Sequence, residues 1–145
     1  DTLILGQKDA QQAALVRAMM RDLGVAVRLD VAPIVRERDG VALSSRNAYL
    51  NGGQRARAAG LSLALRAAAA AVRSGERVAT RITGAARSTL RREARPDAVD
   101  YLALVDPKTF APVHRLERRS LLIAAIRIGR TRLLDNRFLS PGGRA

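Results

Sequence analysis

A block of eight residues, 40–47, brings together side chains that suit the binding of an anion. It reads Gly-Val-Ala-Leu-Ser-Ser-Arg-Asn, and Asp39 directly precedes it. Ser44 and Ser45 can each donate a hydroxyl hydrogen, and Arg46 offers a planar fork of donors that stays charged at any working pH. The backbone N–H groups of such a loop can also form an anion-binding nest. The block predicts a phosphate site, although taken alone it favours the plainer alternative, a Ser or Asn that caps a short helix.

A second segment suited to anions, residues 6–9, follows the first apolar run. Gly6 would let a ligand approach the backbone, Lys8 would place an ammonium beside a phosphate, and Asp9 could accept from ribose hydroxyls or hold magnesium through water. Gln12 lies one turn further, on the same rim. In open α/β sheets ligands collect at such strand ends. Taken alone, the segment is better explained by a turn glycine, a solvated lysine and a capping aspartate, so the prediction rests on both segments together.

The N-terminal elements that must position these side chains form one strand-helix-strand unit. Residues 2–5 are uniformly apolar, which predicts a buried parallel strand with helices on both of its faces. Apolar residues at helical spacing predict a helix from Asp9, its N-cap, to residue 23, with Gly24 as the stop. Residues 25–31 then predict a second strand, parallel to the first through a right-handed crossover.

The remainder of the chain predicts an α+β lid attached through residues 36–42. Two helices over a three-stranded, mainly antiparallel sheet is the economical arrangement. Gly142-Gly143 predicts a frayed end. The expected helices span 54–73 and 78–94, and the expected strands span 98–105, 121–128 and 132–134.

The charge of the chain is strongly positive, at +13, which is a standard pointer to nucleic acid. Of the 26 basic residues only Lys8 and Lys108 are lysines, and the arginines are spread among alanines where the outer faces of helices are expected. Solvated helix faces therefore explain the charge better than a nucleic-acid partner. A basic module for RNA or another polyanion stays as the alternative function, and its binding would collapse with added salt.

Cysteine is absent, so the chain can form neither a disulfide framework nor a thiolate metal site. The longest apolar run, 121–126, is far shorter than the ~20 residues that cross a bilayer, and the residues that follow Asp1 do not form a charged-then-apolar leader pattern. These features predict a cytoplasmic protein without a membrane segment.

Three separated segments carry a resemblance to a known family. Residues 6–13 read Gly-Gln-Lys-Asp-Ala-Gln-Gln-Ala, residues 33–36 read Pro-Ile-Val-Arg, and residues 39–50 contain the Ser-Ser-Arg-Asn block. At this spacing they resemble the second half of pantothenate synthetase, a family also called pantoate–β-alanine ligase. Residues 99–102 and 132–136 resemble its C-terminal strands, so the likeness covers nearly the whole chain.

The fold that the resemblance implies is α/β with two parts. Residues 1–40 would be the last strand-helix-strand unit of a Rossmann-like nucleotidyltransferase domain, and residues 41–145 a small α+β C-terminal domain. The implied reaction uses ATP and Mg²⁺ to join pantoate and β-alanine through a pantoyl adenylate. Members of the family form homodimers through a front domain.

The resemblance also implies roles for individual residues. Gln12 would hydrogen-bond pantoate, Val35 would meet the adenine, and Lys8 would contact the phosphates. The catalytic candidates are Lys8, Ser44, Ser45 and Arg46. The ATP-binding candidates are Gly6, Gln7, Lys8, Asp9, Val35, Leu43, Ser44, Ser45 and Arg46, the last four forming a mobile phosphate clamp.

Two departures from the family pattern concern position 7 and the histidines. Gln7 stands where the family commonly has Glu, a change that keeps reach and an acceptor. The family's front half carries a His-x-Gly-His motif whose histidines contact phosphates, whereas the one histidine of this chain, His114, is expected on a surface loop. We therefore expect this chain alone to make little or no pantothenate, and its first strands to lack a neighbour on at least one side.

Overall fold

The computed structural model describes residues 1–142 and begins with a strand-helix-strand unit, the N-terminal unit. Its parallel strands pair with Thr2 opposite Arg28 and Gly6 opposite Ala32, which confirms the predicted unit. Its elements are strand β1 (Thr2–Gly6), the 3-10 turn η1 (Gln7–Asp9), helix α1 (Ala10–Asp22) and strand β2 (Arg28–Ala32).

The end of α1 explains why β2 begins three residues later than predicted. Gly24 adopts φ +62°, and the N–H of Val25 donates back to the carbonyl of Met20 at 2.8 Å. This closing turn uses residues that the apolar pattern placed in the strand. At the other end Asp9 occupies the N-cap position without capping the helix, because its carboxylate instead accepts from the Lys8 ammonium at 3.1 and 3.2 Å.

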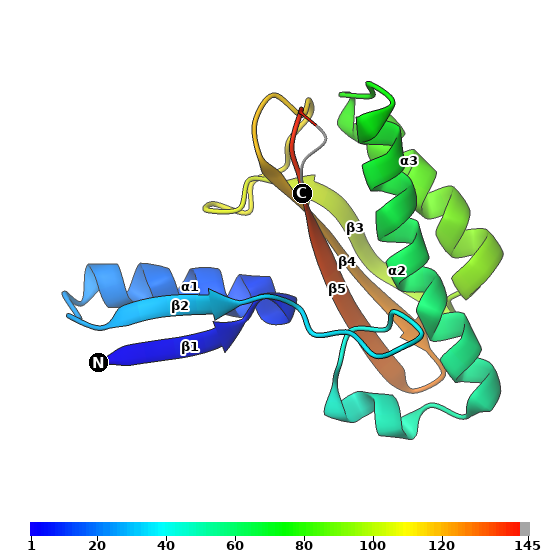
Figure 1. The fold of residues 1–145 in the computed structure, drawn as a ribbon, viewed down its shortest axis with the longest axis horizontal. Coiled ribbons are helices and arrows are strands. Elements are labelled where there is room, and N and C mark those ends of the chain that lie inside the picture. The colour runs from blue at the N-terminus through cyan, green and yellow to red at the C-terminus, as the bar shows by residue number, and fades with distance from the viewer. Residues whose placement is uncertain (143–145) are drawn as a thin grey trace.

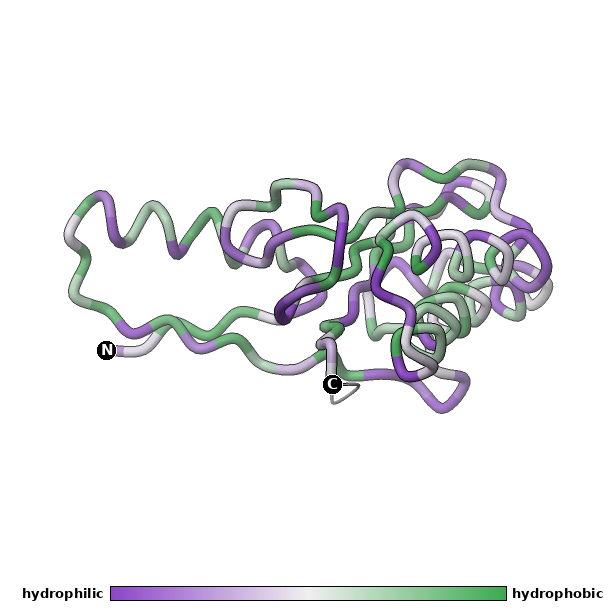
Figure 2. Tube along the Cα trace, turned by 90° about the horizontal axis from the view of Figure 1, so that it is seen from above, coloured by the Kyte–Doolittle hydropathy of each residue, from purple (hydrophilic) through white to green (hydrophobic). Residues whose placement is uncertain are grey.

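The strands of the N-terminal unit are more exposed than the apolar run predicted. Leu3 is 38% and Ile4 66% exposed, because the sheet has two strands and each pairs with only one neighbour. The prediction of a buried strand over 2–5 is therefore wrong for this structure. The expectation that both strands would lack a neighbour on one side is confirmed. Figure 2 shows the unit projecting from the rest of the molecule, with hydrophobic residues along its strands.

The C-terminal part is the predicted pair of helices over a three-stranded sheet. The strands run antiparallel in the order β3-β4-β5. Helix α2 starts with a capping box, since Asn51 Oδ1 accepts from Gln54 N at 2.9 Å and Gln54 Oε1 accepts from Asn51 N at 3.1 Å. The elements are α2 (Gly52–Arg73), α3 (Ala79–Thr89), the π-helical turn η3 (Leu90–Ala94), β3 (Ala98–Val105), β4 (Ser120–Ile128) and β5 (Thr131–Leu139).

The three-stranded sheet separates two packed layers. Alternate residues of β4 such as Leu122 and Ile126 join the core under α2 and α3, whereas Leu121 and Ile123 pack on the opposite face, where Ala10 of α1 lies against them. The helices and the N-terminal unit therefore cover opposite sides of the sheet (Figure 1).

Two predicted boundaries move in the structure. β5 extends to Leu139 instead of ending at residue 134. Polar residues interrupt the apolar pattern there, yet their backbone continues the ladder, with Asn136 opposite Ile123. The helix predicted over 78–94 ends as η3, and Arg95 leaves it with φ 44° before Pro96.

The described chain ends at Gly142, the first residue of the predicted frayed pair. Gly143, the second residue of that pair, lies outside the described residues. Within residues 1–142 every helix is too short or too polar to cross a bilayer.

Candidate functional site

The lysine turn, residues 6–9, is fastened to strand β5 by Asn136. The Asn136 amide donates from Nδ2 to the carbonyls of Gln7 (2.8 Å) and Lys8 (3.1 Å), and its Oδ1 accepts from Gln7 Nε2 at 3.0 Å. Asn136 is only 3% exposed. One buried amide thus docks the N-terminal unit on the sheet through the turn that carries Lys8.

The neighbouring residue, Asp135, anchors the linker hairpin, residues 36–42. Arg36 donates from Nη1 to Asp135 Oδ2 at 2.7 Å and from Nη2 to Oδ1 at 2.9 Å, and Nη1 also donates to the Gly40 carbonyl at 3.0 Å. The hydrogen bonds that Arg36 donates to Asp135 raise the pKa of the guanidinium. This two-point geometry fixes the orientation of the guanidinium as well as its charge.

Helix α2 holds the outer side of the linker hairpin through Arg55. Its guanidinium pairs with Glu37 at 2.5 Å and with Asp39 at 2.6 Å. Hydrogen bonds from Arg55 hold the pKa of both carboxyl groups below their ordinary values. The linker hairpin leads directly into residues 43–46, which we call the serine-arginine loop. The start of this loop is therefore tied to both α2 and β5.

The loop itself opens the short 3-10 helix η2 (Ser45–Tyr49). Ser44 Oγ accepts from the N–H of Arg46 at 3.3 Å, so the plainer interpretation of the loop, an N-cap, is confirmed. This cap uses the oxygen of Ser44 as acceptor and leaves its hydroxyl hydrogen to donate to another group. Capping and phosphate binding are therefore compatible at Ser44.

Asn47 fixes the base of this loop. Its Nδ2 donates to Glu37 Oε1 at 2.6 Å and to the Ala42 carbonyl at 3.1 Å, and the residue is 7% exposed. Its Oδ1 is buried without a hydrogen-bond partner in the described part of the chain. Such an acceptor suits a donor on a ligand or on a water molecule.

The structure brings the lysine turn and the serine-arginine loop to one pocket. Lys8, Ser44 and Arg46 all line it, and its other polar residues are Asn47, Ser62, Arg132 and Asp135. The pocket is narrow, with a free volume of about 10 Å³, which is room for a water-sized group. Lys8 and the pair Ser44 and Arg46 thus come to one pocket from segments more than thirty positions apart, and Arg132 adds a third cation to its lining.

A second pocket adjoins the first and shares Lys8 with it. Its volume is about 160 Å³, and Asp9, Gln12 and Tyr101 line it. Burial raises the pKa of the Tyr101 phenol. The predicted pantoate ligand Gln12 and the predicted ribose or metal ligand Asp9 thus lie on one cavity beside the predicted phosphate ligand.

The other predicted ATP contacts lie on exposed surface. Val35 is 63% and Leu43 55% exposed, and the N–H of Leu43 donates to the carbonyl of Val35 at 2.9 Å, so the two lie side by side. Ser45 is exposed and does not line the narrow pocket. Gly6 has an ordinary extended φ of −81°, and no atom lies within 4 Å of the position of a Cβ there. A ligand can therefore approach this backbone from the open side.

Four polar residues hold the site together, although the sequence analysis gave none of them an individual role. They are Arg36, Asn47, Asp135 and Asn136. The sequence did contain one signal, because the two polar residues Asp135 and Asn136 directly follow apolar strand positions. In the structure both of them are buried. Buried polar side chains of this kind usually hold distant segments together.

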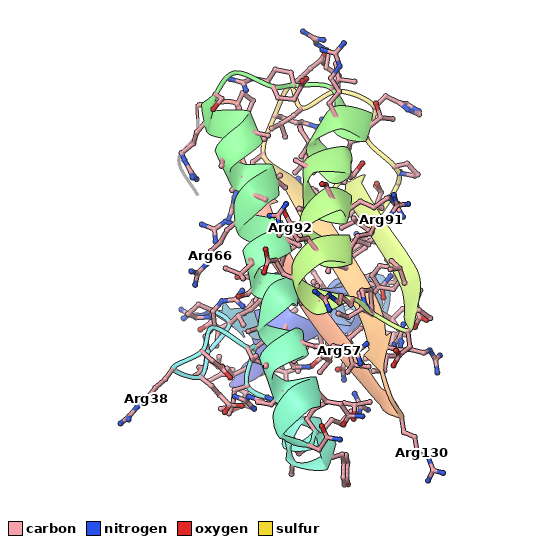
Figure 3. The ribbon with its side chains drawn as sticks, turned by 90° about the vertical axis from the view of Figure 1, so that its right-hand side faces the viewer. Arg38, Arg57, Arg66, Arg91, Arg92 and Arg130 are labelled. Carbon is pink, nitrogen blue, oxygen red and sulfur yellow. The ribbon has the colours of Figure 1, made fainter. Side chains whose placement is uncertain are left out.

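The arginines outside the site are dispersed, as the sequence predicted. Figure 3 shows six of them spread over the linker hairpin, the helical layer and the β4–β5 turn rather than in one stripe. Ten arginines of the described residues lie in ion pairs. His114 is exposed on a loop, as expected. These positions agree with the predicted explanation of the charge, arginines on solvated faces of several elements.

Comparison with known proteins identifies the family. The model of the Pantoate-beta-alanine ligase family matches residues 1–138. The chain belongs to this family. A pantothenate synthetase of Anaeromyxobacter dehalogenans is 50% identical over 133 residues, which cover 92% of this chain and 45% of that protein. The chain thus spans about half the length of the relatives it matches.

Solved structures of this family agree with the fold. The crystal structure of pantothenate synthetase from Thermus thermophilus matches with a TM-score of 0.91 at 38% identity, covering 97% of this chain and 50% of the other. The Francisella tularensis pantoate-beta-alanine ligase, complexed with beta-gamma ATP and beta-alanine, matches with a TM-score of 0.61 at 26% identity, covering 94% and 42%. In both comparisons this chain covers about half or less of the length of the relative.

Proposed function

We propose that this chain supplies one wall and the lid of the ATP site of a pantoate–β-alanine ligase. The observation that carries this proposal is the shared pocket of Lys8 with Ser44 and Arg46. Membership in the family supports the substrates ATP, pantoate and β-alanine. The ATP bound to the Francisella relative supports a nucleotide as the ligand.

In the proposed reaction the carboxylate of pantoate attacks the α-phosphorus of ATP. Pantoyl adenylate forms and pyrophosphate leaves, and the amine of β-alanine then displaces AMP to give pantothenate. Negative charge grows on the phosphate oxygens as pyrophosphate departs. Lys8, Ser44 and Arg46 stabilise that charge with donors that are already in place, while Ser45 extends the clamp from the exposed side. The substrate itself attacks, so the reaction needs no protein nucleophile.

The remaining candidates orient the substrates. Gln12 hydrogen-bonds pantoate in the second pocket, and Val35 and Leu43 offer apolar surface to the adenine. Gly6 and Gln7 contribute backbone to the nucleotide wall, because the side-chain amide of Gln7 already bonds Asn136.

Magnesium fits this site only with the phosphates as its main ligands. Mg²⁺ is usually held by one or two carboxylates together with substrate phosphates and waters. Residues 1–142 contain no group of three potential metal-binding side chains. Of the two carboxylates in the second pocket, Asp9 would hold the ion, because its side chain is 43% exposed whereas that of Asp135 is 2% exposed. The ion would neutralise phosphate charge.

Nucleotide titration tests the proposal. Calorimetry of the 145-residue chain with ATP should show binding that Lys8→Ala and Arg46→Ala each weaken about fivefold to tenfold, since each loses a charge-assisted contact. Arg130→Ala, at the exposed β4–β5 turn, is the matched control and should leave ATP affinity unchanged. Equal ATP affinity in all four proteins, together with tight and salt-sensitive RNA binding, would instead favour a polyanion module.

A turnover assay complements the titration. Without the histidine motif, we expect the chain alone to form little or no pantothenate even where it binds ATP. Homodimerisation through a front domain stays a prediction from the resemblance, and a cytoplasmic location stays a prediction from the composition.

A further inference from the structure

A further cavity lies at the joint between the N-terminal unit and the sheet, and we call it the joint cavity. Its volume is about 390 Å³, within the range of sites for small organic ligands. One wall is the small-residue face of α1, with Ala10, Ala13 and Ala14, and the opposite wall includes Leu121 and Phe138. Lys8, Ser44 and Arg46 do not line it, and Ala10 is the one residue that it shares with the second pocket.

Aromatic residues are concentrated at the joint cavity. The chain has only four, and two of them, Phe110 and Phe138, line this one cavity. The Arg119 guanidinium lies 3.7 Å from the centroid of the Phe138 ring, in a cation–π contact. Both rings contribute apolar surface to the cavity wall.

The backbone at Phe110 is held in an unfavourable conformation. Its φ is 58°, in the left-handed region that bulky side chains avoid, and its N–H donates to the Asp106 carbonyl at 2.9 Å. Asp106 in turn accepts from the N–H groups of Lys108 (2.8 Å) and Thr109 (3.0 Å), which fixes the turn. Strained residues of this kind persist where the surroundings determine them, and they cluster at ligand sites.

Three cations surround the joint cavity. Arg17, Lys108 and Arg119 line it and are exposed, and none of them forms an ion pair within residues 1–142. The nearby carboxylate of Asp106 is already engaged by backbone N–H groups and by Arg118 at 3.1 Å. The cavity therefore combines an apolar interior with an excess of positive charge at its edge.

We propose that the joint cavity binds a small organic anion with an aromatic body and one carboxylate, sulfonate or phosphate group. The ring lies between the alanine face of α1 and the phenyl groups of Phe110 and Phe138. The acid group accepts hydrogen bonds from Arg119 and Lys108, and Arg17 adds charge from the opposite wall. An aromatic body suits flat phenyl walls, and the uncompensated cations select against neutral or basic ligands.

A ligand in the joint cavity contacts both parts of the protein at once. Arg17 belongs to α1, whereas Lys108 and Arg119 belong to the C-terminal part, so binding stabilises the docked arrangement of the two. Gln7 also lines the cavity, one residue before Lys8. Binding here is independent of the function proposed above, because none of the proposed phosphate ligands takes part in it.

Calorimetric titration with 2-naphthalenesulfonate tests the assignment. We expect one saturable site per chain. Arg119→Gln and Lys108→Gln should each weaken binding about fivefold, through loss of a charge-assisted contact. Ala14→Phe should fill the cavity and weaken binding more than about tenfold, with circular dichroism to verify that α1 is intact. The uncharged 2-naphthol and sulfate alone should both bind at least about tenfold more weakly.

Two control variants exclude binding elsewhere. Ile4→Thr alters the exposed strand β1, and Arg130→Gln removes an exposed cation at the β4–β5 turn, so both should bind 2-naphthalenesulfonate like the parent. Hydrogen exchange should show ligand protection in residues 10–17 and 106–110. Parent-like affinity in Arg119→Gln and Ala14→Phe, or protection confined to β1 and β2, would overturn the proposal.

Discussion

At the residue scale, the linker hairpin accepts only glycine at position 40. Gly40 has φ +87°, and a Cβ there would lie 2.9 Å from Ser62 Oγ and 3.4 Å from Arg66 Nη2. Its carbonyl accepts from Arg36, the residue that Asp135 anchors. Backbone conformation and close packing therefore both require glycine at the turn that precedes the serine-arginine loop.

Gly40→Ala should destabilise the chain by about 1–3 kcal/mol, because the substitution adds both backbone strain and a steric contact. Urea unfolding followed by circular dichroism measures this loss. Gly52→Ala is the control, since no atom lies within 4 Å of its Cβ position and Ala favours the first turn of α2. Equal unfolding midpoints for the two variants would contradict the reasoning.

Asn136→Asp should loosen the docking of the N-terminal unit. The substitution removes the Nδ2 donor that serves the carbonyls of Gln7 and Lys8 and places a carboxylate against them, at a cost of about 1–3 kcal/mol. Hydrogen exchange should accelerate in α1 before it does in α2. Arg130→Gln, an exposed change at the β4–β5 turn of the same sheet, should leave both helices at parent rates. Uniform exchange in the Asn136 variant would show that the amide does not hold the units together.

At the element scale, α2 and η3 approach closely because one residue has no side chain. A Cβ on Gly60 would lie 2.5 Å from the N atom and 2.7 Å from the Cα of Ala94, both of which are backbone atoms that cannot swing aside. Gly84 in α3 has no atom within 4 Å of its Cβ position and is exposed. Close packing therefore requires glycine at position 60 and leaves room for a side chain at position 84.

Gly60→Ala should therefore destabilise the protein by roughly 2–3 kcal/mol, although alanine is the better helix former. Gly84→Ala should stabilise it by about 0.5–1 kcal/mol, because only the helix propensity changes. Thermal unfolding of both variants beside the parent measures the difference. A stabilised Gly60 variant would mean that α2 can shift away from η3 without loss.

The linker hairpin also bears on where the two parts of the chain divide. Val41 and Ala42 are buried, and Val41 belongs to the core under α2. Arg36 and Glu37 pair with the C-terminal part as well. The predicted division at residue 40 stays a prediction, and these contacts favour a hinge nearer Pro33.

At the scale of the whole molecule, ion pairs to arginine make stability depend on acid pH. Arg55 lowers the pKa of Glu37 and Asp39, Arg57 and the Gly129 N–H lower that of Asp97, and Arg132 and Arg127 lower that of Asp100. A carboxyl group with a lowered pKa in the folded state stabilises the fold above its unfolded pKa. This contribution disappears as pH falls through the folded value.

The free energy of unfolding should therefore be level near neutral pH and fall as the pH drops below about 4. Urea titrations at about pH 7, 4 and 3 measure the change. Arg55→Gln should reduce the slope, since Glu37 and Asp39 then titrate closer to their ordinary values. An unfolding free energy that does not change between neutral pH and the most acidic point would show that these pairs contribute nothing.

The sequence by itself determined which local elements form and which residues carry charge and hydroxyls. Periodicity, capping residues and turn glycines act over a few positions, so the strand-helix-strand unit, both helices of the C-terminal part and the Ser-Ser-Arg-Asn cap were predictable. Tertiary structure decided which of these elements meet. The bonds of Asp135 and Asn136 join positions about a hundred or more residues apart, and no local pattern encodes such a partner. The burial of strand 2–5 could not be predicted either, because it depends on how many neighbouring strands the sheet contains.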